Sequence, residues 1–202
     1  MTRHHPAEAT LLACAAGTLP RLHARVLEFH LSACPRCHRQ VRNFNEVGGA
    51  LLTSLSPAPL RPDAMTRTLA RLDKVPSATN AAAPSLVWLA TGRWWWAGSG
   101  VRLMPLVRRD ETDTRLDLVR VAAGVALPEH THTGPETVCI LQGSFNDETG
   151  HYALHDIAES DGTLLHQPVA APGPDCICLI ATTGRLRANG WLARLIQPLI
   201  DV

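Results

Sequence analysis

The stretch GVALPEHTHTGPE, residues 124–136, decides the fold of the second half of this 202-residue chain. Side chains two apart on a strand point to the same face, so His130 and His132 present two imidazoles to one ion. Glu136 adds a carboxylate four residues later, after the chain has turned. Imidazole and carboxylate together suit a metal that keeps some coordination positions open. The stretch therefore predicts a metal site on β-strands.

The fixed residues of this stretch resemble the first motif of the cupins. All five fixed positions of that motif are present, namely Gly124, His130, His132, Glu136 and Gly143. The second cupin motif is poorer, because only Gly162 and His166 are kept. The resemblance implies an all-β barrel in which His166 is the fourth metal ligand. Short apolar runs separated by turn residues agree with a barrel, at residues 101–107, 116–121, 137–141 and 176–180.

A second candidate metal site of softer character lies near the amino end, in the pattern His30-x3-Cys34-x2-Cys37. Thiolate and imidazole are the usual ligands of a closed structural zinc site. The fourth ligand is expected from His5 or His4, with His5 preferred and His38 as the fallback. Three other interpretations are open: haem attachment at C-x-x-C-H, a thioredoxin-like dithiol, and cysteines without a metal.

The first 75 residues read as a small helical bundle. Apolar spacing and Pro or Gly punctuation predict helices at about 7–16, 20–31, 35–55 and 63–72. Residues 76–86 are small and uncharged, as in a linker between domains. We therefore expect a multi-domain α + β chain, with a helical zinc domain over 1–75, the linker over 76–86 and the cupin barrel over 87–202.

The charge and composition of the chain limit which compartment and which partners we expect. The net charge of +1 divides into ten Arg/Lys against five Asp/Glu in residues 1–75, and nine against thirteen in residues 76–202. The basic residues are not interleaved with aromatics, so direct DNA binding by the first half is a weak hypothesis. Neither a secretory signal nor an apolar run of about 18 residues stands out, so we expect a cytoplasmic protein with reduced cysteines.

The helical half resembles the zinc-binding anti-sigma domain of bacterial anti-sigma factors, whose ligand pattern falls on His5, His30, Cys34 and Cys37. An anti-sigma domain followed by a cupin is similar to the ChrR group of anti-sigma factors. The resemblance implies a non-enzymatic regulator that binds an alternative sigma factor of the extracytoplasmic-function type, one to one, and keeps it from RNA polymerase. It also implies that the cupin mediates release when singlet oxygen or organic hydroperoxides appear.

We expect Zn²⁺ in the first site, and Zn²⁺ or another divalent metal in the cupin, because a redox-silent ion fits a regulator whereas iron or manganese would fit an oxygenase-type cupin. The competing hypothesis is a metal-dependent cupin enzyme, a dioxygenase or isomerase, with an appended zinc module. Cys176 and Cys178 are either an oxidant-sensitive pair or two small core residues. His151 and His155 are expected at the surface. Trp94, Trp95 and Trp96 cannot all face inward on a strand, so one or two of them are expected to pack at the barrel rim or at the domain contact.

Overall fold

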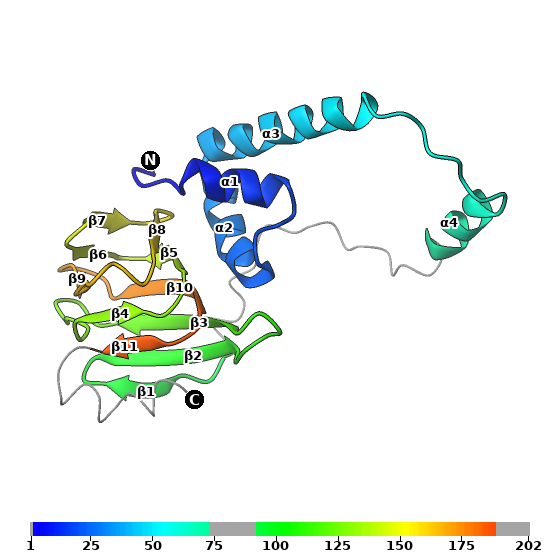
Figure 1. The fold of residues 1–202 in the computed structure, drawn as a ribbon. Helices are drawn as coiled ribbons and strands as arrows, with labels where there is room; N and C mark the ends of the chain where they lie inside the picture. Colours follow the sequence, from blue (N-terminus) through cyan, green and yellow to red (C-terminus); the bar gives the residue numbers. More distant parts are fainter. Residues whose placement is uncertain (1, 73–91, 189–202) are drawn as a thin grey trace.

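The structure is a computed structural model that describes residues 2–72 and 92–188. In these residues a four-helix region precedes a β-rich, cupin-like domain, as the sequence predicted (Figure 1). The helices are α1 (Glu8–Ala15), α2 (Arg21–Ala33), α3 (Pro35–Thr53) and α4 (Ala64–Leu72). None of them combines the length and apolar character needed to cross a membrane. The predicted linker 76–86 lies outside the described residues, so the domain boundaries stay predictions.

Eleven strands are described in the second half. They are β1 (Trp95–Gly98), β2 (Val101–Val107), β3 (Thr114–Val121), β4 (His130–His132), β5 (Glu136–Gln142), β6 (Ser144–Asp147), β7 (Gly150–Ala153), β8 (Ile157–Ser160), β9 (Val169–Ala170), β10 (Cys176–Thr183) and β11 (Leu186–Ala188). Six of them form the main sheet, in the order β1-β2-β3-β10-β5-β8. Two smaller sheets, β11-β4 and β7-β6-β9, complete the barrel.

Glycine makes possible the turn between β5 and β6. Gly143 has φ +68°, and a Cβ there would lie 2.6 Å from the carbonyl oxygen of Asp175. Any other residue would meet both backbone strain and a clash at this point. The turn residue that the sequence pattern singled out is therefore required by the backbone.

The junction between α2 and α3 follows from Pro35. The residue before a proline avoids helical geometry, and Cys34 is extended with φ −112° and ψ 97°. Pro35 then occupies the first turn of α3, where its missing N–H costs nothing. One helix therefore ends and the next begins at a pair of residues that brings Cys34 and Cys37 close to the end of α2.

Strand alternation gives the main sheet two faces with different partners. Residues such as Leu118 on β3 and Leu179 on β10 point outward and pack against α2, through Leu22, Val26 and Phe29. The residues between them point into the barrel, where Val138, Ile140 and Phe145 belong to a separate cluster. The helical region and the barrel therefore share one hydrophobic core rather than meeting only through the predicted linker.

This shared core predicts that a cavity under α2 destabilises the whole fold. Leu118 is fully buried, and Leu118→Ala should lower the free energy of unfolding by about 2–5 kcal/mol. Leu165 is half exposed, and Leu165→Ala should change the free energy by no more than about 0.5 kcal/mol. Denaturant unfolding of both variants measures the difference, and equal small losses would refute the shared core.

Candidate metal centres

Two groups of side chains in the described residues have the composition and spacing to hold a metal ion. The amino-terminal cluster is made of His5, His30, Cys34 and Cys37, and the barrel cluster of His130, His132, Glu136 and His166. In each group, one possible ligand atom from each residue lies within 4.8 Å of all the others. The chain therefore carries two candidate metal-binding clusters, one of mixed sulfur and nitrogen and one of nitrogen and oxygen.

The amino-terminal cluster joins the start of the chain to the junction between α2 and α3. His30 comes from the last turn of α2, Cys34 from the junction and Cys37 from the first turn of α3. The Nδ1 atom of His5 lies 3.4 Å from the Sγ atoms of both Cys34 and Cys37. The other candidates from the sequence lie elsewhere. The ring of His4 packs against that of Tyr152, with centroids 4.2 Å apart and the ring planes tilted by 34°, and His38 is exposed.

The electrostatics of this cluster favour neutral imidazole and one easily ionised thiol. Burial lowers the pKa of His30, and burial together with the charge of Arg36 lowers that of His5. Burial opposes ionisation of Cys34, but hydrogen bonds from Thr2 and around Cys37 outweigh it, so the pKa of Cys34 is lowered. Burial and the neighbouring Cys34 raise the pKa of Cys37 to about 12. A cation is what would let both thiols ionise side by side.

The barrel orients His30. Its Nδ1 lies 2.7 Å from the carbonyl oxygen of His155, so the ring donates its Nδ1–H outward and turns Nε2 inward. That Nε2 is buried and has no hydrogen-bond partner in the described residues. Metal-binding histidines are commonly fixed this way, with one nitrogen bonded to a carbonyl and the other left for the ion. The orphaned nitrogen therefore fits a metal in this cluster.

The barrel also holds the segment that carries His5. The buried carboxylate of Asp156 accepts hydrogen bonds from the backbone N–H groups of Arg3 and His4, at 2.6 and 3.2 Å. Glu159 accepts the backbone N–H of Ala7 at 2.7 Å, just before α1 begins. The position of His5 therefore depends on two acidic side chains of the barrel.

In the barrel cluster three imidazoles converge on one point. His130 and His132 lie on β4, and His166 lies opposite His130, with which it forms an isolated antiparallel bridge. The Nε2 of His166 lies 3.1 Å from that of His130 and 3.3 Å from that of His132. Glu136, at the start of β5, places Oε1 3.5 Å from Nε2 of His132.

Hydrogen bonds to groups outside the cluster determine which ring nitrogen of each histidine faces its centre. The Nδ1 of His130 lies 2.7 Å from the carbonyl oxygen of Pro128, and the Nδ1 of His166 lies 3.1 Å from the carboxylate of Asp147. Both rings therefore donate outward, and two Nε2 lone pairs meet at 3.1 Å. Lone pairs repel at that distance unless a cation lies between them. His132 is less fully fixed, because its buried Nδ1 has no partner in the described residues.

The pKa shifts of the barrel cluster suit neutral imidazoles. Burial lowers the pKa of His130, and burial with the neighbouring His166 lowers that of His132 to about 4. Burial raises the pKa of Glu136, while a hydrogen bond from Thr182 at 2.8 Å opposes that shift. The cluster can thus supply three neutral nitrogens and one carboxylate, and a bound cation would favour the ionised carboxylate.

The cluster opens on a cavity of about 390 Å³ inside the barrel. Its wall is mostly apolar, but a buried ion pair, Arg115 with Asp117, also lines it. Cys176 and Cys178 line it too, with their Sγ atoms 3.5 Å apart on one face of β10, as strand alternation predicted. Both thiols are buried, which is the environment of small core residues, and whether they react with oxidants stays an open prediction.

The sequence missed the groups that position these clusters. His151 is exposed as expected, but the backbone of His155 has φ +67° and its carbonyl orients His30. Asp147 and Asp156 carried no motif, because each acts on residues far away in the sequence. Trp94 packs against the core shared with α2, whereas Trp95 and Trp96 are exposed.

Comparisons with known proteins agree over nearly the whole chain. Residues 83–185 match the family model of the ChrR cupin-like domain. The chain is 36% identical to the anti-sigma-E factor ChrR of Cereibacter sphaeroides over 212 aligned residues, which cover 99% of each protein. It also resembles the crystal structure of Rhodobacter sphaeroides SigE in complex with the anti-sigma ChrR, with 36% identity and a TM-score of 0.77 over 90% of this chain and 100% of that one.

The contact between Asp147 and His166 predicts a role for Asp147 in metal affinity at the barrel cluster. Asp147→Asn should weaken binding there about 10- to 100-fold, because the amide holds the imidazole less firmly and makes it less basic. Asp161 is a matched control, since it accepts the same local hydrogen bonds from Thr163 that Asp147 accepts from Thr149. Competition with a chromophoric chelator measures both, and equal affinities would contradict the role.

The high pKa of Cys37 predicts that zinc binding at the amino-terminal cluster releases protons. A thiol with a pKa of about 12 is protonated at neutral pH, so at least about one proton should leave for each zinc bound. Affinity should therefore rise about tenfold for each pH unit between about pH 6 and 8. Calorimetric titration of His132→Ala in two buffers of different ionisation enthalpy measures the protons, and a value of zero would contradict ionised thiols as ligands.

Proposed function

Because this chain belongs to the ChrR family of anti-sigma factors, we propose that it sequesters an alternative sigma factor of the extracytoplasmic-function type. Its relative is named as a regulator rather than an enzyme, so the expected absence of catalysis is confirmed and the cupin dioxygenase or isomerase is set aside. In the proposed function the helical region binds the sigma factor in a cytoplasmic, one-to-one complex. That complex keeps the sigma factor from core RNA polymerase, without direct contact to DNA or membrane.

The observation that carries this proposal is an exposed apolar surface on α3, α4 and the segment between them. The first half of α3 buries its apolar face, since Val41 and Phe44 pack against α1 and α2 residues. The same face then continues outward uncovered: Val47 is 59% exposed and Leu51 is 64% exposed. We call the uncovered residues the apolar strip: Val47, Leu51, Leu52, Leu55, Leu60, Met65, Leu69 and Leu72.

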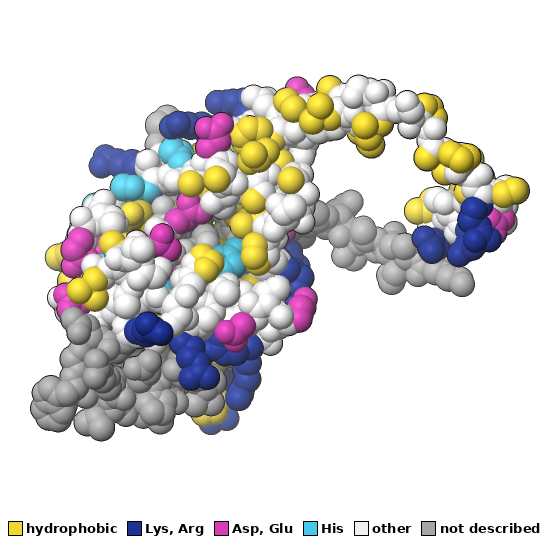
Figure 2. Space-filling view, viewed as in Figure 1, with side chains coloured by type: hydrophobic (Ala, Val, Ile, Leu, Met, Phe, Trp, Pro, Cys, Tyr) yellow, Lys and Arg dark blue, Asp and Glu magenta, His cyan; other side chains and the backbone are white. Residues whose placement is uncertain are grey.

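The apolar strip has the character of a surface that meets another protein. Figure 2 shows hydrophobic side chains along the part of α3 that projects from the body of the molecule, and again on α4. Single exposed apolar residues are ordinary, but several exposed apolar residues gathered along one helix, as on α3, usually mark an interaction site. Arg36, Arg39 and Arg42 are exposed on the same helix and supply a basic rim for an acidic partner surface.

Zinc in the amino-terminal cluster would hold together the segments that position α3, the helix that presents this surface. Its proposed ligands, His5, His30, Cys34 and Cys37, fix the start of the chain and the α2–α3 junction together. A structural zinc of this composition contributes directly to folding free energy. The direction in which α3 leaves the body would then depend on the metal.

We further propose that the barrel cluster controls release of the sigma factor when singlet oxygen or organic hydroperoxides appear. His130, His132, Glu136 and His166 would hold Zn²⁺ or another divalent ion beside the internal cavity. A signal can release the partner only if it changes the free and bound states unequally. The shared core beneath α2 supports such an effect, because a change inside the barrel acts on the sheet that carries the helical region.

The apolar strip predicts where sigma-factor binding can be broken without unfolding the chain. Leu51→Asp should weaken the complex about thirtyfold or more, as expected for a hot spot of about 2 kcal/mol, because it places a carboxylate within the part of the strip that α3 carries. Leu154 on the barrel is also half exposed, and Leu154→Asp is the matched control. Co-purification and titration with a labelled sigma factor measure both. Equal affinities for the two variants would remove α3 from the interface.

A further inference from the structure

His23 is a buried histidine that neither candidate cluster uses. It lies on α2 and is 3% exposed, at the contact between the helical region and the barrel. Its Nδ1 lies 2.9 Å from the hydroxyl of Thr137, and its Nε2 lies 2.9 Å from the hydroxyl of Thr183. Burial lowers its pKa, so the ring is neutral and can donate to one threonine while it accepts from the other.

The two threonines stand directly behind the barrel cluster. Thr137 follows Glu136 on β5, and Thr183 follows Thr182 on β10. Glu136 and Thr182 are cross-strand partners whose side chains are hydrogen-bonded inside the barrel. Neighbouring strand residues point to opposite faces. The same two strand ends therefore carry the cluster on one face and the contacts of His23 on the other.

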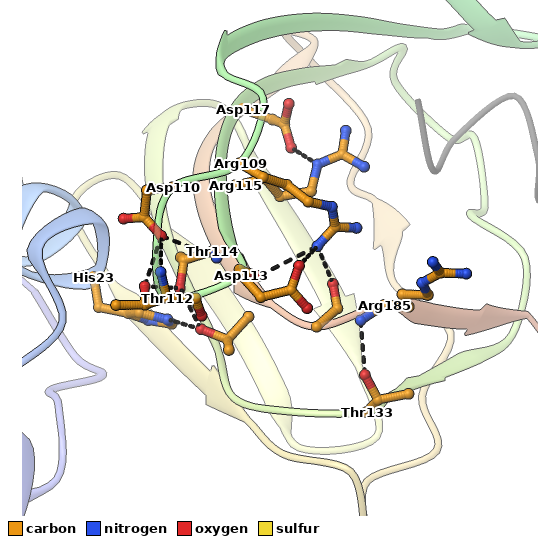
Figure 3. Close-up of polar contacts among 12 residues, drawn as sticks. His23, Arg109, Asp110, Thr112, Asp113, Thr114, Arg115, Asp117, Thr133 and Arg185 are labelled. Atoms are coloured by element: carbon orange, nitrogen blue, oxygen red, sulfur yellow. Dashed lines mark hydrogen bonds and ion pairs between the residues drawn. The ribbon is translucent and has the colours of Figure 1, made fainter.

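The contact on the outer face belongs to a larger hydrogen-bonded group (Figure 3). Thr183 is bonded at 2.7 Å to Thr114 on β3, and Thr114 at 2.9 Å to Thr112. Asp110 accepts hydrogen bonds from the hydroxyl and the backbone N–H of Thr112. Thr183 is thus held in place by the loop before β3, while Thr137 is bonded to His23 directly from β5, so a shift of either strand acts on the imidazole through a hydrogen bond.

From His23 the helix leads directly to the amino-terminal cluster. His30 lies seven residues, about two turns or 10 Å, further along α2, so both side chains face the barrel. Between them Val26 is fully buried in the shared core. A hydrogen-bonded helix segment packed along its length moves as one body. Displacement of α2 at His23 would therefore reach a proposed zinc ligand at its other end.

We propose that His23 is a positioning residue that couples the barrel cluster to the helical region, through its paired hydrogen bonds to Thr137 and Thr183. The inference rests on the proposed function and names the route by which the barrel regulates sigma-factor release. A hydrophobic residue would pack α2 onto the sheet equally well. The two hydrogen bonds also fix the position of α2 relative to Thr137 and Thr183, which a hydrophobic contact would not do.

The test separates binding of the sigma factor from its release. Cells carry the full-length chain, an extracytoplasmic-function sigma factor that co-purifies with the wild-type chain, and a reporter that this sigma factor drives. Reporter output is measured in darkness and with illuminated methylene blue, a source of singlet oxygen. His23→Phe keeps a ring of similar size and removes both hydrogen bonds. His151→Phe, at an exposed histidine of β7, is the matched control.

Under the inference, His23→Phe represses the reporter in darkness as the wild type does. Its light-induced output falls about tenfold, a change that corresponds to a typical coupling free energy between two sites. Thr137→Val combined with Thr183→Val removes the same bonds from the barrel side and should give the same loss. If His23→Phe fails to fold, this double valine variant still tests whether the two hydrogen bonds are needed for the response. The control should respond like the wild type.

Two results would overturn the inference in distinguishable ways. If His132→Ala abolishes the response but both His23→Phe and the double valine variant respond fully, the barrel cluster regulates release by another route and only the coupling role fails. If the wild type does not respond, or His132→Ala responds like the wild type, the proposed regulation by the barrel cluster fails and the coupling role falls with it.

Discussion

The antiparallel pairing of β10 with β3 and β5 is the constraint on which the rest of the structure depends. Alternation along these strands assigns each side chain to one of two faces, and the register aligns Glu136 with Thr182 and Thr182 with Arg115. One face builds the interior of the barrel with its candidate metal cluster, and the other receives α2. A one-residue slip would exchange the two sets, so metal site and helix contact are specified by the same register.

The sequence predicts the parts of this protein whose determinants are local. Pro35 sets the break between two helices, and the spacing from His30 to Cys37 then brings three side chains together at that break. In the barrel, His130 and His132 point to the same face because they lie two residues apart on one strand. The role of His166 could be predicted only from the resemblance to a known motif, because it meets His130 through a tertiary contact across 36 residues.

The parts that could not be predicted depend on contacts between distant segments. Nothing local marks the carbonyl of His155 as the partner of His30, or Asp156 as the acceptor that holds residues 3 and 4. The periodicity of α3 indicates one continuous apolar face, yet Phe44 is covered and Leu51 is exposed. Periodicity reports that a face is apolar, but only the arrangement of α1 and α2 decides how far along the helix it is buried.

The central claim is that the helical region and the barrel form one body through α2. Residue-resolved hydrogen exchange of the full-length, zinc-loaded chain and of its His132→Ala variant, in which the barrel cluster lacks one of its ligands, addresses it directly. We expect that amides of α2 share the protection of β3 and β10 and lose it together with them when the cluster is disabled, while α4 exchanges quickly in both proteins. Protection of α2 that ignores the barrel cluster and follows α3 alone would contradict it.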